Sequence, residues 1–418
     1  MKKEIIVVGG GFAGVNFIRS LKNSKDYNIT LVDKNNYNFF PPLLYQVATA
    51  FLEVSNISYP FRRLFRKHKN VKVRLGELIE INKAENKIVL SNGELKYDHL
   101  VIATGTISNF FGMKNIEENA LPMKTVDDAI LLRNTMLSKL EKATIEKNPE
   151  KRLELGTVVI AGGGPTGVEI AGMLAEMKKN IIEKDYPELR GLDLPIWLVD
   201  GSPALLSPMS EKSQKYTLAS LTNMGVKVKL NTQVKDYVNN EVIFSDGHKI
   251  NSQLLFWTAG VVSQTFRGFS PESFGRGKRL IVDGYNKVIG TENIFAIGDT
   301  CISIEDKKFP GGHPQLAQVA IQHGKNLASN LKNIIKGKEQ KVFSYHDKGT
   351  MAIIGRVKAT ADFPKPKFTI TGALAWMMWL FVHLFSLINY RNRIKTMYNW
   401  TISYFSKDQT LRMIIRPK

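Results

Sequence analysis

Two glycine fingerprints of the same type limit what this chain can fold into more than any other feature. They read GGGFAG at residues 9–14 and GGGPTG at residues 162–167, each behind a short run of β-branched residues and ahead of a helical pattern. A strand before and a helix after are what turn the G-x-G-x-x-G spacing into a dinucleotide site. Both helices then direct their N-termini at a phosphate group. The sequence therefore predicts two dinucleotide sites in one chain.

An acidic residue ends the next predicted strand after each fingerprint. Asp33 follows a strand over residues 28–32, and Asp200 follows a strand over residues 195–199. A carboxylate at this place in a dinucleotide fold accepts hydrogen bonds from ribose hydroxyls. The distance to Asp200 is longer than usual because residues 178–193 look like an inserted segment. A solvated strand end stays open as the alternative for Asp200.

The two halves of the chain repeat one layout. The strand-like segments at residues 99–105 and 254–260 both end in small residues, which lets a ligand lie against the backbone. A charged helical connection over residues 126–149 separates the halves, and another strand follows within residues 294–299. This pattern indicates an internal duplication of architecture.

Cysteine usage limits the redox chemistry that the chain itself can supply. Among 418 residues, 43% of them apolar, the only cysteine is Cys301. An intramolecular disulfide, a Cys-x-x-Cys pair and a cysteine metal cluster are excluded, and we expect no metal site. Any redox chemistry is therefore expected from bound cofactors. The first strand begins near Glu4, so we expect no cleavable signal and a cytoplasmic location.

Three motifs give the chain a family resemblance. FPPLLYQVAT at residues 40–49, GGGPTGVE at residues 162–169 and AQVAIQHG at residues 317–324 resemble type II NADH dehydrogenases, the single-subunit NADH:quinone oxidoreductases of the two-dinucleotide flavoprotein family. The resemblance implies an α/β fold with two Rossmann-like dinucleotide-binding domains, the FAD domain being interrupted by the NADH domain, plus a C-terminal helical membrane-anchoring region.

The resemblance also implies domain boundaries. We expect the parts of the chain in this order: a first part of the FAD-binding domain (1–125), a helical connection (126–155), the NADH-binding domain (156–270), a second part of the FAD-binding domain (271–335) and the membrane-anchoring region (336–418).

Cofactor roles follow from the same resemblance. The residues expected to bind FAD are Gly9, Gly11, Gly14, Asp33, Ala103, Thr104, Gly105, Gly298 and Asp299. The residues expected to bind NADH as substrate are Gly162, Gly164, Gly167 and Asp200. An acid at Asp200 repels a 2′-phosphate, so NADH is favoured over NADPH. For Gly298 and Asp299, a plain turn is the alternative.

Three further residues are candidates for catalysis. Glu169 lies in the first turn of a helix, where the dipole favours a carboxylate; the resemblance places it near flavin and nicotinamide, in proton handling or in ordering the reduced flavin. Gln318 and Gln322 share one helix face, where paired glutamines are commonly solvated. The resemblance implies instead that they offer neutral donors to quinone carbonyl oxygens. Pro314 is expected in the first turn of that helix, and small residues at Ala317 and every third or fourth position after it should let the helix pack closely.

The C-terminal fifth carries more than half of the net positive charge of +20 and also the longest uncharged stretch. Residues 331–418 contain sixteen lysines and arginines and four acids, whereas residues 368–390 contain no Asp, Glu, Lys or Arg. Tryptophans within this stretch, and cations mixed with large apolar residues after it, favour helices that lie in an anionic membrane surface over a transmembrane span. Nucleic acid is disfavoured as a partner because no recognition motif accompanies the charge.

Together these features predict a non-proton-pumping NADH:quinone oxidoreductase at the cytoplasmic face of the cell membrane. Hydride passes from NADH to FAD, and two electrons then pass to ubiquinone or menaquinone; a homodimer is also expected as a candidate state. Two alternatives stay open: a sulfide:quinone oxidoreductase-like flavoprotein, which the single cysteine opposes, and a non-catalytic FAD protein that senses NADH.

Overall fold

The computed structural model describes residues 2–406 and 411–415. The chain divides into two compact units, which are described one at a time. The first unit comprises Met1–Phe39, Tyr59–Ile107 and Val261–Asp347; the second comprises Phe40–Ser58, Ser108–Gly260 and Lys348–Lys418. Each unit is therefore built from segments that are distant in the sequence.

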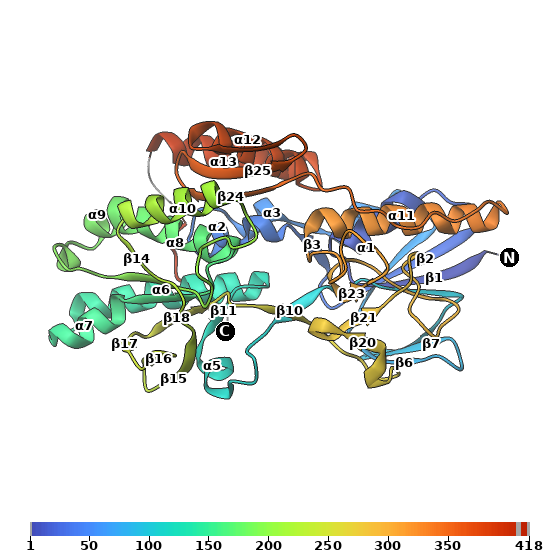
Figure 1. The fold of residues 1–418 in the computed structure, drawn as a ribbon, viewed down its shortest axis with the longest axis horizontal. Helices are drawn as coiled ribbons and strands as arrows, with labels where there is room; N and C mark the ends of the chain where they lie inside the picture. Colours follow the sequence, from blue (N-terminus) through green and yellow to red (C-terminus); the bar gives the residue numbers. More distant parts are fainter. Residues whose placement is uncertain (1, 407–410, 416–418) are drawn as a thin grey trace. The chain divides into compact units, whose positions relative to one another are not determined.

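A five-stranded parallel sheet forms the centre of the first unit (Figure 1). Runs of Ile, Val and Leu without polar alternation fit a parallel sheet that is covered on both faces. In β1, for example, residues Ile5 to Val8 are all buried. The strands in spatial order are β22 (Ile294–Ala296), β9 (His99–Ile102), β1 (Lys3–Val8), β2 (Tyr27–Asp33) and β5 (Val71–Leu75).

Two helices of the first unit pack closely on each other. They are α1 (Phe12–Leu21) and α11 (Ala317–Ile335). A side chain at Gly324 would overlap the carbonyl of Ala13, so the prediction that small residues permit close packing of this helix is confirmed here. The predicted helix start is wrong: α11 begins at Ala317 after an N-cap at Leu316, and Pro314 therefore lies ahead of the first turn.

The second unit contains another five-stranded sheet with the same βαβ start. Its first helix after the fingerprint is α8 (Pro165–Met177), and α6 (Val126–Ile145) is the predicted helical connection. The strands in spatial order are β11 (Leu121–Pro122), β18 (Leu254–Trp257), β12 (Val158–Ala161), β13 (Ile196–Val199) and β14 (Val226–Lys229). The two sheets confirm the predicted pair of Rossmann-like folds.

Antiparallel sheets accompany both parallel sheets. In the first unit, β6 (Leu78–Asn82), β7 (Lys87–Leu90) and β8 (Gly93–Lys96) form one. In the second unit, β15 (Val234–Val238), β16 (Glu241–Phe244) and β17 (Lys249–Asn251) form its counterpart. The turn between β15 and β16 uses Asn239 and Asn240 at positive φ, where asparagine is tolerated.

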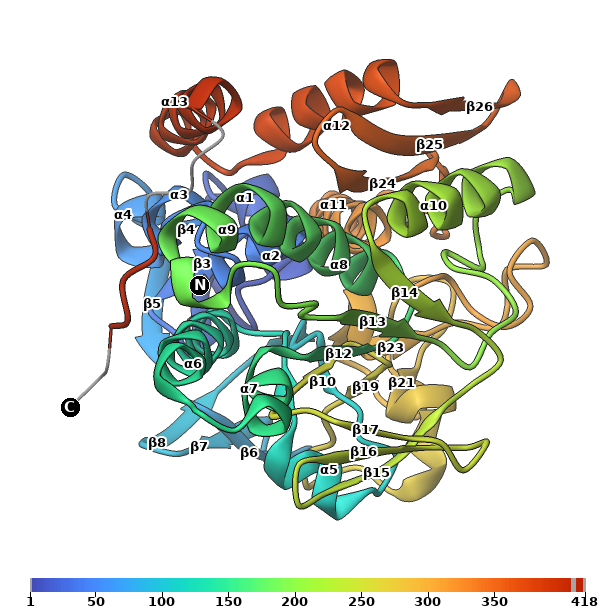
Figure 2. The same ribbon diagram turned by 90° about the vertical axis from the view of Figure 1, so that its left-hand side faces the viewer.

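The C-terminal part of the second unit begins with a sheet that the sequence analysis did not predict. Strands β24 (Thr350–Gly355), β25 (Lys358–Pro364) and β26 (Lys367–Thr371) are antiparallel neighbours. Helices α12 (Ala373–Ser386) and α13 (Tyr390–Ser406) follow. Figure 2 shows α12 beside β25 and β24 along α8. The C-terminal region is thus helical only after residue 372.

Candidate functional site

The first fingerprint joins β1 to α1, and its glycines meet different steric demands. Gly9 has a φ of +104°, and a side chain there would overlap the carbonyl of Ala103. A side chain at Gly14 would overlap the carbonyl of Gly9. Only a glycine at this position therefore lets α1 start so close to β1. At Gly11, by contrast, an added Cβ would have no heavy atom within 4 Å. Gly11 is the N-cap of α1 without a side-chain hydrogen bond, which fits a phosphate group.

The second fingerprint, between β12 and α8, repeats this geometry. Gly162 has a φ of +110°, and a side chain at Gly167 would overlap its carbonyl. A Cβ at Gly164 would again have no neighbour within 4 Å. Gly164 is the N-cap of α8, also without a side-chain cap, and Pro165 occupies the first turn. Each Rossmann unit therefore offers the same cradle for a pyrophosphate.

Both predicted ribose ligands hold the glycine loop of their own fingerprint. Asp33 accepts a hydrogen bond from the backbone N–H of Gly10 at 2.6 Å and another from Asn35 at 2.7 Å. Asp200 likewise accepts from the N–H groups of Gly163 and Ser202. A carboxylate has about four acceptor positions, so each can still accept from ribose hydroxyls. Burial raises the pKa of Asp33, and the two backbone donors oppose this rise.

The remaining predicted FAD ligands lie at the same edge of the first sheet. Strands β1, β2, β9 and β22 are parallel neighbours, so their carboxyl ends meet at one edge. Ala103, Thr104 and Gly105 follow β9, while Gly298 and Asp299 follow β22. The Thr104 hydroxyl lies 3.3 Å from that of Thr300. Ligands of open α/β sheets bind at this edge.

His323 is a residue of this site that the sequence analysis missed. It belongs to α11, is 2% exposed, and its Nδ1 accepts a hydrogen bond from the Gly298 N–H at 3.1 Å. Burial lowers the pKa of His323 to about 3, so the ring is neutral and can accept at Nδ1. Its place within the motif at residues 317–324 was the available signal. His323 thus positions the loop that contains Asp299.

Glu169 is buried in the second unit rather than placed at an exposed helix end. Its side chain is 8% exposed and accepts a hydrogen bond from the backbone N–H of Ile353 in β24. Burial raises the pKa of Glu169 well above its ordinary value, and the Ile353 donor opposes this only in part. A helix cap alone would leave the carboxylate in solvent. The environment instead favours the protonated form of this carboxyl group over its ionised form.

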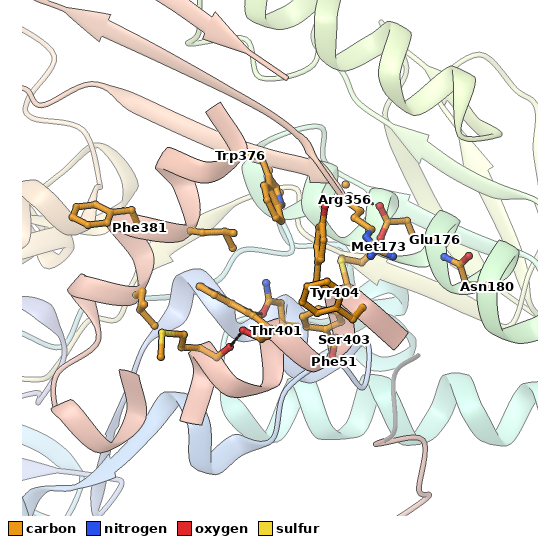
Figure 3. A pocket seen from close by; sticks show the side chains of 18 of the residues that line it. Phe51, Met173, Glu176, Asn180, Arg356, Trp376, Phe381, Thr401, Ser403 and Tyr404 are labelled. Carbon is orange, nitrogen blue, oxygen red and sulfur yellow. Dashed lines mark hydrogen bonds between the residues drawn. The ribbon is translucent and has the colours of Figure 1, made fainter. Parts of the chain in front are cut away.

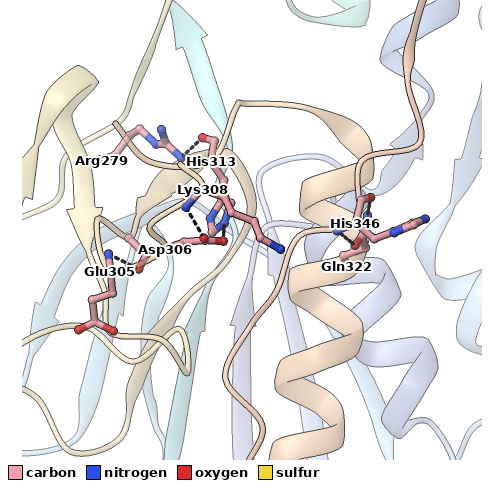
Figure 4. Close-up of polar contacts among 8 residues, drawn as sticks. Arg279, Glu305, Asp306, Lys308, His313, Gln322 and His346 are labelled. Atoms are coloured by element: carbon pink, nitrogen blue, oxygen red, sulfur yellow. Dashed lines mark hydrogen bonds and ion pairs between the residues drawn. The ribbon is translucent and has the colours of Figure 1, made fainter. Parts of the chain in front are cut away.

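The two glutamines of α11 are both half-buried, and one has a clear backbone partner. Gln322 Nε2 donates to the carbonyl of His346 at 2.9 Å, and its Oε1 accepts from the His346 N–H at 3.0 Å (Figure 4). Gln322 therefore ties the segment before β24 to the helix, and it keeps one N–H for another acceptor. Gln318 lies one turn earlier on the same face.

A cavity of about 310 Å³ lies within the second unit between α8, α12 and α13 (Figure 3). Leu380, Phe381 and Leu384 of α12 line it together with apolar residues of α13. Its polar lining includes Glu176 and Arg356, and the Arg356 guanidinium lies 4.4 Å from the ring centre of Tyr404. The cavity is thus apolar with a few polar groups, as small-molecule pockets commonly are.

The long uncharged segment does not form a single helix. Its first residues belong to β26, and α12 ends at Ser386. In the part of the chain that the structure describes, no helix combines the length and the apolarity needed to cross a bilayer. Large apolar side chains on one face of α12 are instead exposed: Leu374, Met377, Phe381 and Phe385.

Comparison with known proteins identifies the family. The family model of pyridine nucleotide-disulphide oxidoreductases matches residues 3–324, and the model of the NDH2 C-terminal domain matches residues 347–407. Two relatives from Mycobacterium tuberculosis (strain ATCC 25618 / H37Rv), the type II NADH:quinone oxidoreductases Ndh and NdhA, are each 34% identical over 97% of this chain and 89% and 88% of their own lengths. The chain belongs to the type II NADH:quinone oxidoreductases.

Solved structures share the fold of this type II enzyme. NDH2 from Plasmodium falciparum in complex with NADH is 22% identical and superimposes with a TM-score of 0.89 over 100% of both chains. The sulfide:quinone oxidoreductase from Aquifex aeolicus is 21% identical, with a TM-score of 0.75 over 99% of this chain and 96% of its own. At these identities the likeness concerns the fold alone.

Family membership confirms the predicted activity. The protein is a non-proton-pumping NADH:quinone oxidoreductase with FAD as its cofactor, NADH as its substrate and a quinone as electron acceptor. The relatives favour this activity over both alternatives. In addition, Cys301 is fully buried, and burial raises the pKa of its thiol to about 12, so this sulfur is a poor nucleophile.

The neutral His323 ring predicts acid sensitivity of the first unit. The folded pKa of about 3 lies below the ordinary value of 6.5, so the unfolded state binds more protons between these values. The free energy of unfolding should therefore fall as the pH drops below 6.5, by about 2 kcal/mol at pH 5. In His323→Gln, which keeps an acceptor for Gly298, this dependence should flatten. Urea unfolding of both proteins at pH 7.5 and pH 5 measures how much the free energy of unfolding changes between these pH values. An equal change in both proteins would contradict the neutral state assigned to His323.

Proposed function

We propose that the first fingerprint holds FAD and the second holds NADH. The repeated cradle supports two dinucleotide sites: in both units the middle glycine, Gly11 or Gly164, faces space at an uncapped helix N-terminus. The order, with FAD at the first site, is the one that the family resemblance implies. Asp33 and Asp200 then accept from the adenosine riboses. The pyrophosphate of each nucleotide replaces the side-chain cap that each helix lacks.

In this assignment the chain binds and orients while the cofactor supplies the electron chemistry. When bound, FAD takes two electrons from NADH as a hydride and gives two electrons to a quinone. Ala103, Thr104 and Gly105 keep the backbone close to the cofactor, and Asp299 accepts from a ribityl hydroxyl. His323 supports that contact by fixing the Gly298 N–H.

We assign Glu169 to proton handling during quinone reduction. Reducing a quinone to a quinol consumes two protons, and burial, which raises the pKa of Glu169, makes its carboxyl group a better proton carrier than a solvated carboxylate. Gln318 supplies an amide donor to a quinone carbonyl. Gln322 donates its remaining amide N–H to the quinone, while its other two hydrogen bonds hold the backbone of His346.

We further propose that α12 and α13 lie in the surface of an anionic membrane, at its cytoplasmic face. The exposed apolar row on α12 is matched on α13 by Ile394, Tyr398, Ile402 and Phe405, spaced as one helix face. The excess of positive charge after residue 331 attracts anionic headgroups. That the quinone is ubiquinone or menaquinone stays a prediction. Assembly into a homodimer also stays a prediction.

Replacing Glu169 tests the proton assignment. Glu169→Gln keeps the size of the side chain and removes its proton. We expect NADH to bleach the flavin absorbance at the normal rate, whereas re-oxidation by a soluble quinone analogue slows at least tenfold. The thermal midpoint should change little because the amide is uncharged. Small and equal changes in turnover and stability would instead reduce Glu169 to a packing residue.

Vesicle binding tests the membrane assignment. The protein should cosediment with anionic vesicles more than with zwitterionic ones, and high salt should release part of it. Phe381→Ser with Phe385→Ser should weaken binding at least tenfold because two exposed rings no longer enter the bilayer. Ile145→Ser is the matched control, since Ile145 is 79% exposed on α6. Equal weakening in the control, or indifference to lipid charge, would contradict the assignment.

A further inference from the structure

Helix α13 has an inner row of residues that fastens it to the segment containing α2 (Leu44–Ala48) and α3 (Val54–Ile57). Asn392, Thr396 and Trp400 are spaced four residues apart and are buried. Asn392 donates to the carbonyl of Ser58 at 3.0 Å, and Thr396 donates to that of Asn56 at 3.5 Å. The same helix therefore has an exposed apolar face and a hydrogen-bonded inner face.

The last contact of this inner row continues into the protein. The indole N–H of Trp400 donates to Oε1 of Gln46 at 2.8 Å, and Nε2 of Gln46 donates to the hydroxyl of Tyr45 at 2.8 Å. Gln46 is 3% exposed and Tyr45 is 1% exposed. Because the indole can only donate, it fixes which end of the amide faces Trp400 and hence which end faces Tyr45.

Tyr45 brings this chain of hydrogen bonds close to Glu169. Helix α2, which contains Tyr45, packs on α8, which contains Glu169, and both side chains are buried. The pKa of Tyr45 is raised first by burial and then by the ionised form of Glu169, which agrees with this proximity. The ring of Tyr45 also contacts Trp379 edge-on, with ring centroids 6.4 Å apart. Trp379 in turn lies 5.9 Å from Trp400. The Tyr45 hydroxyl is therefore confined by aromatic packing and directed by one amide.

We propose that Gln46 and Trp400 are positioning residues for the quinone-reducing step: together they fix the Tyr45 hydroxyl beside the Glu169 carboxyl. This inference rests on the role proposed above for Glu169. Tyr45 orients the carboxyl and keeps its own proton. Since Trp400 belongs to the helix assigned to the membrane surface, correct seating of α13 becomes a condition for rapid quinone reduction.

Removing single polar atoms separates this role from simple packing. Gln46→Met keeps an unbranched side chain but loses both hydrogen bonds, Tyr45→Phe loses only the hydroxyl, and Trp400→Phe keeps an aromatic ring without the donor. Tyr390→Phe is the matched control because this tyrosine is 74% exposed at the start of α13.

The test uses the full-length protein loaded with FAD and follows its two half-reactions by stopped-flow absorbance. In the three positioning variants, re-oxidation by a soluble quinone analogue should slow about three- to tenfold, the effect of one buried hydrogen bond. Its pH profile should also shift. Bleaching by NADH should stay within twofold of the unsubstituted protein. The control should retain both rates.

A second comparison tests the route through Glu169. In a Glu169→Gln background, Gln46→Met should slow re-oxidation no further. Equal slowing in both backgrounds, or slowing of both half-reactions together, would overturn the positioning role. If Gln46→Met does not fold, as judged by flavin content and thermal midpoint, Tyr45→Phe in the same two backgrounds decides. If Glu169→Gln alone leaves re-oxidation unchanged, the proposed function of Glu169 fails first, a result that these variants distinguish.

Discussion

The backbone contact between the first and third glycines of each fingerprint is the constraint on which the rest of the structure depends. Gly14 lies against the carbonyl of Gly9, and Gly167 lies against that of Gly162, with no space for a side chain. Only this approach lets a helix begin directly at the end of its strand. The N-terminus of the helix then faces the edge where the strands end, and its free N–H groups create a site for a pyrophosphate.

Side chains outside each glycine loop hold the loop in this conformation by hydrogen bonds. The carboxylates of Asp33 and Asp200 each accept a backbone N–H from the middle of their own glycine loop, so the residues assigned to ribose also hold the loop in shape. At the neighbouring strand, His323 does the same for Gly298. In the proposed assignment, cofactor binding and local folding depend on the same side chains, and a substitution at any of them should affect both.

Local patterns predicted the elements of the two Rossmann units, because strands, glycine turns and helices there follow from adjacent residues. Long-range partners could not be predicted in the same way. The sheet of β24, β25 and β26 forms between short mixed segments, and the partner of Gln322 is a backbone group at His346. Likewise, nothing in the sequence near Gln46 indicates that Trp400 binds it. The helix start predicted at Pro314 is wrong because, although proline often begins a helix, the loop here continues to Leu316.

The division of labour between the two cradles is the central claim, and two equivalent substitutions test it most directly. Gly11 and Gly164 both have extended backbone and no neighbour within 4 Å of an added Cβ, so valine at either place should fill ligand space without disturbing the fold. We predict that Gly11→Val purifies without flavin. Gly164→Val should keep its flavin, which dithionite but not NADH bleaches. Loss of flavin from Gly164→Val together with its retention in Gly11→Val would contradict the account.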